Sequence, residues 1–509
     1  MQQSTNGSVH SLPEHVRVCI VGTGFSGIAM AIRLKQDGVD DFVLIERAED
    51  LGGTWRDNTY PGCACDVPSH LYSFSFEPNP GWSRTFSPQP EIWDYLRRTS
   101  DKHGVSSHMR FGHELQEAAW DEDEQVWRLE TSKGSLTADV VVSGVGGLSE
   151  PKLPDLPGID SFEGEAFHSA QWNHDVDITG KRVAVIGTGA SAIQIVPRIQ
   201  PKVGKLALFQ RTPPWIVPQR DRRMSRIERA LYKLFPPAQL AMRAAIYWAR
   251  ELFVLGFMRA KAGGPNERLA LRHLHKQVPP GELRDKLTPN YRMGCKRVLI
   301  SDTYFPALQQ PNVDLVTDAI AEITPKGIRT ADGVEHELDV IVFGTGFHVS
   351  DMPIAERVRG REGLRLFDVW EGSPQAYLGI TVSGFPNFFM LLGPNTGLGH
   401  NSVVFMAEAQ ANYVTEALRY LGRSGVHHLE PRAEAQAEFN DGIQRKLQGT
   451  VWNSGGCKSW YLDAKGRNSV IWPGFTWPYR QLTSSFDPTD YVLAPAAARL
   501  DGARARSAA

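Results

Sequence analysis

Two glycine-rich segments of the sequence have the spacing that binds phosphate groups. The first reads Gly22-Thr23-Gly24-Phe25-Ser26-Gly27, and the second reads Gly187-Thr188-Gly189-Ala190-Ser191-Ala192. Each follows a run rich in β-branched residues and precedes a helical pattern, so its glycines can bring a pyrophosphate close to the positive end of a helix. We therefore expect dinucleotide contacts from Gly22, Gly24, Phe25, Ser26 and Gly27 in one site, and from Gly187, Thr188, Gly189, Ala190 and Ser191 in the other.

The residue at the end of the next strand indicates which dinucleotide each segment binds. Glu46 follows the apolar run 42–45 and is placed to accept the two hydroxyls of an adenine ribose, which favours FAD. Arg211 follows the run 206–210 and can pair with a 2′-phosphate, which favours NADPH, with Thr212 sharing that contact. The alternatives are a plain glycine turn for the first segment and a solvated surface arginine for Arg211.

Strand patterns that end in glycines divide the chain into domains. The runs 16–21, 139–142, 182–186 and 339–343 each lead into a glycine turn. The simplest arrangement is an α/β fold with two doubly wound, Rossmann-like dinucleotide-binding domains, the second inserted in the first between Gly144 and Gly344, with a helical insertion. The predicted bounds are 1–145 and 344–509, including a loose C-terminal tail, for the FAD-binding domain, 146–220 and 286–343 for the NADP-binding domain, and 221–285 for the helical insertion.

The composition is that of a globular protein with several domains. The chain has 509 residues, 41% hydrophobic and 22% charged, with a formal net charge of −2. This balance favours neither a nucleic acid nor an anionic membrane as a partner. The apolar stretch 240–258 contains Arg243, Arg250 and Glu251, so we expect an amphipathic helix of the insertion rather than a transmembrane segment.

The cysteines and the N-terminal residues favour a cytoplasmic location. The five cysteines are scattered and odd in number, which suits a reducing compartment better than a disulfide framework. Residues 1–15 lack the apolar core of a signal peptide. The one close pair, Cys63 and Cys65, is separated by a single residue and poorly placed for a redox disulfide, and we predict no metal site.

Two further motifs resemble those of the type I Baeyer–Villiger monooxygenases, flavoproteins of class B that use FAD and NADPH. The first is Gly52-Gly53-Thr54-Trp55, followed by Tyr60-Pro61-Gly62 and by Asp66. The second is Phe162-x-Gly164-x3-His168-x3-Trp172, where Asn173 departs from the proline or aspartate usual in the family and leaves the local turn open. The resemblance extends from about Val16 to Arg480.

The resemblance implies that the chain inserts one oxygen atom of O2 beside the carbonyl of a small-molecule ketone, through a C4a-peroxyflavin, to give an ester or lactone. It implies that Arg297 is catalytic, because a guanidinium suits a developing oxyanion, and that Asp66 pairs with it. Lys296 would help Arg211 to hold the 2′-phosphate, and Trp460 would close over NADP, with a core tryptophan as the alternative. The remaining cofactor contacts implied are Gly53, Thr54, Trp55 and Asp66.

Two segments have competing interpretations. His168 has a reference pKa near neutrality, but its place in the linker motif favours a structural rather than a proton-transfer role. The loop 393–402 precedes a helical pattern whose N-terminus could stabilise a reduced flavin, or it is an ordinary capped loop. The alternative functions are a flavin monooxygenase that oxidises nitrogen or sulfur centres and a non-catalytic flavin redox sensor.

Overall fold

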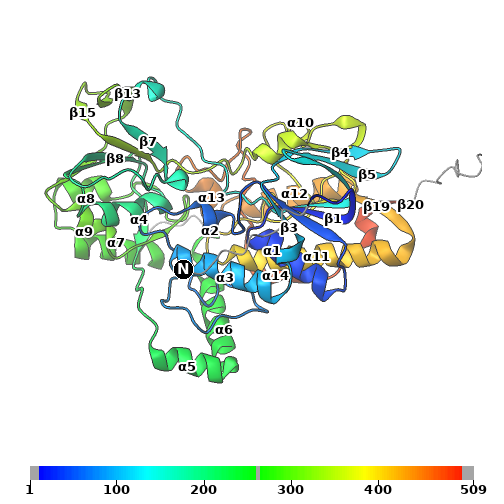
Figure 1. Ribbon diagram of the computed structural model, residues 1–509. Coiled ribbons are helices and arrows are strands. Elements are labelled where there is room, and N and C mark those ends of the chain that lie inside the picture. Colours follow the sequence, from blue (N-terminus) through cyan, green and yellow to red (C-terminus); the bar gives the residue numbers. More distant parts are fainter. Residues whose placement is uncertain (1–10, 259–263, 496–509) are drawn as a thin grey trace, which may run out of the picture.

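Two sheets lie at opposite ends of the molecule, a mixed one around β1 and a parallel one around β8 (Figure 1). The computed structural model describes residues 11–258 and 264–495. Most of the N-terminal segment 1–15 and of the predicted tail 495–509 lies outside the described residues. The two sheets agree with the predicted pair of doubly wound α/β units.

The first sheet has the order β17-β4-β5-β6-β1-β2-β3, and β18 pairs with β6. Val18 of β1 is opposite both Phe42 of β2 and Val140 of β6, so the strand that carries the first glycine motif is central. All five residues of β2 are buried, as expected for a parallel strand covered on both faces. The strands are β1 (His15–Val21), β2 (Phe42–Glu46), β3 (Met109–Phe111), β4 (Leu115–Asp121), β5 (Val126–Thr131), β6 (Gly134–Ser143), β17 (Val358–Arg359) and β18 (Phe388–Met390).

The second sheet is parallel throughout and has the order β12-β9-β8-β16-β7. All its strands lie between β6 and β17 in the chain, so the second unit is inserted in the first, as predicted. The bounds proposed for each domain stay predictions. The strands are β7 (Glu165–His168), β8 (Arg182–Ile186), β9 (Lys205–Phe209), β12 (Val313–Val316) and β16 (Val340–Phe343).

Short ribbons complete the strand inventory of the described residues. The pair β10 (Ile216–Val217) and β11 (Leu299–Ile300) is parallel. The antiparallel ribbons are β13 (Ile320–Thr324), β14 (Gly327–Thr330) and β15 (Glu335–Glu337), and β19 (Val426–Pro431) with β20 (Tyr491–Pro495).

Helices cover the sheets and form the predicted insertion. In the first unit, α1 (Phe25–Gln36) follows the first glycine motif and packs against α11 (Val403–Ser424). In the second unit, α4 (Ala190–Ile199) follows the second motif and packs against α9 (Tyr304–Leu308). The other helices around the first sheet are α2 (Thr54–Asp57), α3 (Gln89–Lys102), α10 (Leu366–Trp370), α12 (Ala433–Leu447), α13 (Val451–Ser454) and α14 (Thr476–Leu482).

The insertion consists of α5 (Arg226–Leu234), α6 (Pro236–Phe253), α7 (Pro265–Gln277) and α8 (Glu282–Leu287). Figure 1 shows α6 running outward from the body and α5 lying at its far end. Within 11–258 and 264–495, no helix has the length and apolar character needed to cross a bilayer.

One expectation about the cysteines was wrong. Cys295 and Cys457 form a disulfide across a sequence separation of 162 residues, with a Cα–Cα distance of 6.2 Å. An odd number of scattered cysteines gave no indication of this bond, because only the tertiary fold brings the two segments together. Cys63 and Cys65 are buried free thiols, as is Cys19.

Candidate active site

The first glycine motif forms a tight turn that only glycines can make. Gly22 has a φ of +99°, and a Cβ there would lie 2.9 Å from the carbonyl oxygen of Gly144 at the end of β6. A Cβ on Gly27 would lie 1.9 Å from the oxygen of Gly22. Gly24 is the N-cap of α1; no side chain of the described residues caps this helix, and its first turn has no acid. Amide donors and the helix dipole are thus available for a pyrophosphate.

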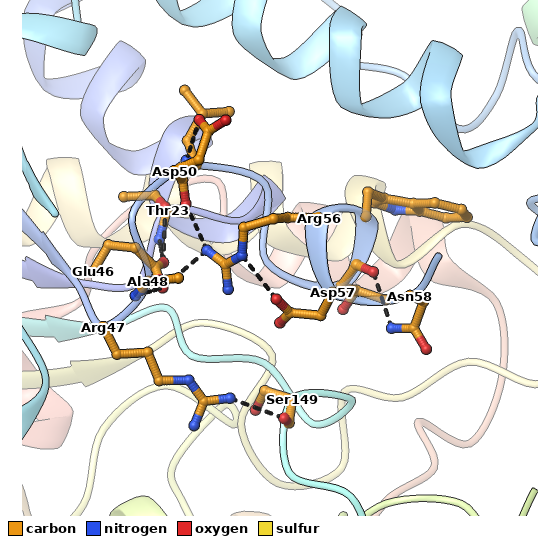
Figure 2. Close-up of polar contacts among 12 residues, drawn as sticks. Thr23, Glu46, Arg47, Ala48, Asp50, Arg56, Asp57, Asn58 and Ser149 are labelled. Carbon is orange, nitrogen blue, oxygen red and sulfur yellow. Dashed lines mark hydrogen bonds and ion pairs between the residues drawn. The ribbon is translucent and has the colours of Figure 1, made fainter. Parts of the chain in front are cut away.

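Glu46 is held firmly at the end of β2 (Figure 2). Thr23 donates to its Oε2 from the backbone nitrogen at 3.1 Å and from Oγ1 at 2.8 Å, and the nitrogen of Ala48 donates to Oε1 at 3.0 Å. Arg56, which sequence reasoning missed, pairs with Oε1 at 3.0 Å. These contacts fix the carboxylate at the place where an adenine ribose would lie in this fold.

Arg56 shares its charge between two carboxylates. Its Nε lies 2.7 Å from Oδ1 of Asp57, while Nη1 contacts Glu46. Burial disfavours the charged guanidinium, but Asp57 and Glu46 outweigh burial and raise the pKa of Arg56. A ribose hydroxyl can replace Arg56 as a partner of Glu46, because Arg56 would still be paired with Asp57. The one feature of the sequence that could have pointed to Arg56 is its position directly after the predicted cofactor contact Trp55.

A cavity of about 350 Å³ brings together residues that the sequence analysis proposed separately. The loop 393–398 also lines it, so the glycine loop before α11 belongs to the site. The predicted residues that do not line this cavity are Gly27, Asp66, those of the second glycine motif, Arg211, Thr212 and Lys296. Those that do are Gly22, Gly24, Phe25, Ser26, Glu46, Gly53, Thr54, Trp55, Arg297 and Trp460.

Arg297 and Asp66 form a two-pronged ion pair at the border of this cavity. Nη2 of Arg297 lies 2.8 Å from Oδ1 and 2.7 Å from Oδ2 of Asp66, and Nε donates to Oδ2 at 3.0 Å. The attraction of Asp66 raises the pKa of Arg297, even though burial opposes the charge. Burial opposes ionisation of Asp66, but Arg297 overcomes it and lowers the pKa of Asp66. Both side chains are therefore charged at neutral pH, and the guanidinium is held in one orientation.

A second cation close to this pair was not recognised from the sequence. Arg250 of α6 interacts electrostatically with both Asp66 and Arg297. Burial lowers the pKa of Arg250, and the proximity of Asp66 counteracts part of that effect. Two guanidinium groups thus face one carboxylate, so the site has a surplus of positive charge. The sequence analysis used Arg250 only as one of the charged residues that make the stretch 240–258 unsuitable as a transmembrane segment.

The second glycine motif repeats the geometry of the first. Gly187 has a φ of +110°, and a Cβ there would lie 2.5 Å from the oxygen of Gly344, which follows β16. Gly189 is the N-cap of α4; as in α1, the described residues provide no side-chain cap and the first turn has no acid. Oγ1 of Thr188 donates to the oxygen of Thr212 at 3.0 Å, which joins the motif to the segment after β9.

Lys296 and Arg211 lie close enough to repel each other. Burial lowers the pKa of Lys296, and the charge of Arg211 lowers it further. The ammonium group also lies 5.3 Å from the centre of the Tyr291 ring. A dianionic phosphate between the two cations would relieve this repulsion, which fits a 2′-phosphate.

The disulfide connects two segments of the site. Cys295 lies two residues before Arg297, and Cys457 lies three residues before Trp460. Trp460 is 44% exposed and packs against Tyr461, with ring centroids 4.5 Å apart. The bond thus limits how far the Trp460 segment can move from Arg297.

His168 has the surroundings of a structural residue. It ends β7, is buried, and its ring meets Phe347 edge-on at 5.5 Å. Its Nδ1 accepts a hydrogen bond from the nitrogen of Ala170 at 3.1 Å. Burial lowers the pKa of His168, so the ring is neutral at pH 7. These contacts are consistent with the interpretation that it does not transfer protons.

The loop 393–402 caps a helix and also contributes to the cavity. Ser402 caps α11, accepting from the nitrogen of Val404 at 3.3 Å. Gly393, Thr396 and Leu398 of the same loop line the cavity. The loop is therefore both an ordinary helix cap and a wall of the site.

The site has one nucleotide motif followed by an acid, Glu46, and one followed by a cation, Arg211, with Arg297 held beside the cavity by Asp66. These features define a flavin-dependent oxidoreductase with two dinucleotide sites. Comparison with known proteins agrees. Residues 15–236 match the family of flavin-binding monooxygenase-like proteins. A Baeyer–Villiger monooxygenase of Streptomyces coelicolor is 52% identical over 498 residues, which cover 97% of this chain and 96% of that protein. The chain belongs to the Baeyer–Villiger monooxygenases.

Solved structures give the same result. Cyclohexanone monooxygenase from Rhodococcus sp. Phi1, bound to NADP+, matches with a TM-score of 0.85 and 30% identity, over 95% of this chain and 100% of that one. The enzyme OTEMO in complex with FAD and NADP matches with a TM-score of 0.83 and 29% identity, over 94% of this chain and 99% of that one.

Proposed function

We propose that this protein uses O2 and NADPH to convert a ketone into an ester or lactone, with FAD held by the first glycine motif and NADPH by the second. The observation that carries this proposal is the Arg297–Asp66 pair, which holds a permanent cation at the border of the cavity lined by the first motif. Oxygen insertion beside a carbonyl develops negative charge on oxygen, and a pre-oriented guanidinium stabilises such charge without reorganising.

The residues present fit both dinucleotides. The N-termini of α1 and α4 offer amide donors for two pyrophosphates, and Glu46 lies where it can hold a ribose. Lys296 and Arg211 would hold the 2′-phosphate that distinguishes NADPH from NADH. When bound, NADPH supplies the hydride and FAD supplies the chemistry that activates O2.

The roles of the other residues follow from charge and access. Asp66 fixes the orientation of Arg297, while Arg250 keeps the net charge beside them positive. Trp460 lines the cavity and would help to exclude water, tethered through Cys457 and Cys295 to the Arg297 segment. A cytoplasmic location, where NADPH is available, is part of this proposal.

The test is the variant Arg297→Ala, assayed by product mass against a panel of ketones. We expect NADPH to reduce the bound flavin at close to the parental rate, whereas ester formation falls by about 10² to 10³, the usual loss when one donor to a developing oxyanion is removed. Ester formation near the parental rate would contradict the assigned role. A parental enzyme that oxidised NADPH only slowly, with no dependence on any ketone, would instead indicate a redox sensor.

A further inference from the structure

The helix α6 has its polar face turned inward and its apolar face turned outward. Nη1 of Arg243 donates to the oxygens of His70 at 2.7 Å and Ser73 at 3.0 Å. Glu251 is buried and accepts from the nitrogen of Thr476 at 2.8 Å. The exposed side chains of α6 are Pro236, Pro237, Leu240, Ala241, Met242, Ala244, Ala245, Trp248, Ala249 and Leu252. The sequence correctly predicted an amphipathic helix, but periodicity alone did not reveal which face lies against the protein.

The short helix α5 continues this apolar surface and adds positive charge. Ile227 and Leu234 are each 83% exposed, and with Leu231 they form a stripe at helical spacing. Arg226, Arg229 and Lys233 border a depression beside Pro80 and Gly81. Within the described part of the chain, none of these three cations has an ion-pair partner.

The carboxylates of the hairpin are all engaged elsewhere. Among residues 221–258, Asp221 pairs with Arg84 at 2.6 Å, and Glu228 pairs with Arg222 at 2.8 Å. Glu251 is the third and lies in the interior. The outward surface of α5 and α6 is therefore apolar and cationic, although the whole chain has a net charge of −2.

We propose that the α5–α6 hairpin, residues 226–253, docks on an anionic membrane surface. Its apolar side chains would enter the headgroup region, and Arg226, Arg229 and Lys233 would contact lipid phosphates. Figure 1 shows α5 projecting from the body at the far end of α6, where a flat surface can reach it. The chain would lie on the bilayer without crossing it.

The charge pattern favours a membrane over a second copy of the chain. A symmetric dimer would place the same patch against itself and bring these three cations near their own counterparts, with no free carboxylate on the described hairpin surface to separate them. An anionic bilayer offers both phosphates and hydrocarbon, so it complements both features of the surface.

The experiment is vesicle flotation of the FAD-loaded enzyme. Phosphatidylcholine vesicles with and without phosphatidylglycerol are compared at low and high salt. We expect the parent to float with the anionic vesicles, more strongly at low salt because screening weakens the attraction. The double variant Arg226→Gln/Lys233→Gln should bind anionic vesicles about 25-fold more weakly, because each cation near such a surface contributes about a fivefold factor. Ile227→Glu/Leu234→Glu should not bind at all.

The control is Leu364→Glu, which adds an acid at another exposed leucine, 53% exposed and close to α10 on the opposite side of Figure 1. It should bind as the parent does, and all variants should retain FAD and ketone-dependent NADPH oxidation. The proposal is overturned if the parent fails to float with anionic vesicles, or if Leu364→Glu weakens binding as much as Ile227→Glu/Leu234→Glu. Sedimentation velocity that shows self-association of the parent, lost in Ile227→Glu/Leu234→Glu, with no vesicle binding, would assign the surface to a second copy.

Discussion

Replacing Asp66 by alanine tests whether orientation of Arg297, and not only its charge, determines activity. In the parent, three contacts of 2.7–3.0 Å join the guanidinium to the carboxylate. In Asp66→Ala the hydrogen bond that remains to Arg297 is the one from Nη1 to the oxygen of Leu398 at 3.5 Å. Arg250 would then repel Arg297 with no carboxylate between them. We expect Arg297 to move away from its position at the cavity.

The cost can be estimated from the exposure of the pair. Breaking a fully buried ion pair costs about 3–5 kcal/mol, and an exposed pair contributes about 0.2–1 kcal/mol. The side chains of Arg297 and Asp66 are 35% and 23% exposed, so we expect the free energy of unfolding to fall by about 1–3 kcal/mol. A displacement of about 1 Å at a reacting centre lowers the rate about 10²-fold, so kcat for ester formation should fall by about that factor.

The assay separates the two half-reactions and the stability. Flavin reduction by NADPH is followed by absorbance, ester formation by mass, and unfolding by urea titration. The matched control is Asp339→Ala, which removes the partner of Arg182 in the second sheet, where Nη2 lies 2.8 Å from Oδ1. That pair is more exposed, so we expect a loss of at most about 1 kcal/mol and unchanged ester formation.

Two results would refute this reasoning. If Asp66→Ala makes ester at the parental rate, Arg297 does not need its partner to be positioned. If flavin reduction and ester formation fall by the same factor, the defect lies in binding of NADPH or FAD and not in the oxygenation step.

Two further predictions follow from the charged groups. Arg211→Ala and Lys296→Ala should each lower the preference for NADPH over NADH, measured as the ratio of kcat/KM, by about 10-fold or more, because each removes a charge-assisted contact to the 2′-phosphate; an unchanged ratio would contradict the assignment. For Asp66, whose pKa is lower in the folded than in the unfolded protein, the contribution to the free energy of unfolding is fully present above its ordinary pKa of 3.8 and is lost as the pH falls through the lower folded value. Asp66→Asn should therefore lose stability at neutral pH and lose less of what remains as the pH falls below 3.8, as measured by urea titration; equal acid sensitivity of parent and variant would contradict this.

Local sequence was sufficient for the features that depend on neighbouring residues. A glycine motif between a strand and a helix can form only one kind of turn, so both nucleotide turns, β1, β2 and β8, and the helices α1 and α4 were predictable. The same holds for Glu46 and Arg211, because Glu46 is the last residue of β2 and Arg211 lies two residues after the end of β9. The pairing of Asp66 with Arg297 was expected only through resemblance to a family, since the two residues are 231 positions apart.

The tertiary structure decided what depends on which segments meet. Arg56 on Glu46, Arg250 beside Arg297, and the Cys295–Cys457 bond had no signature in the local pattern. The direction of the α6 face is the clearest case, because the apolar stripe of an amphipathic helix usually faces the core, whereas the apolar side of α6 is exposed. Interior contacts for Arg243 and Glu251 exist only after residues 70–73 and 476 have folded against the helix, and these contacts turn its apolar side outward.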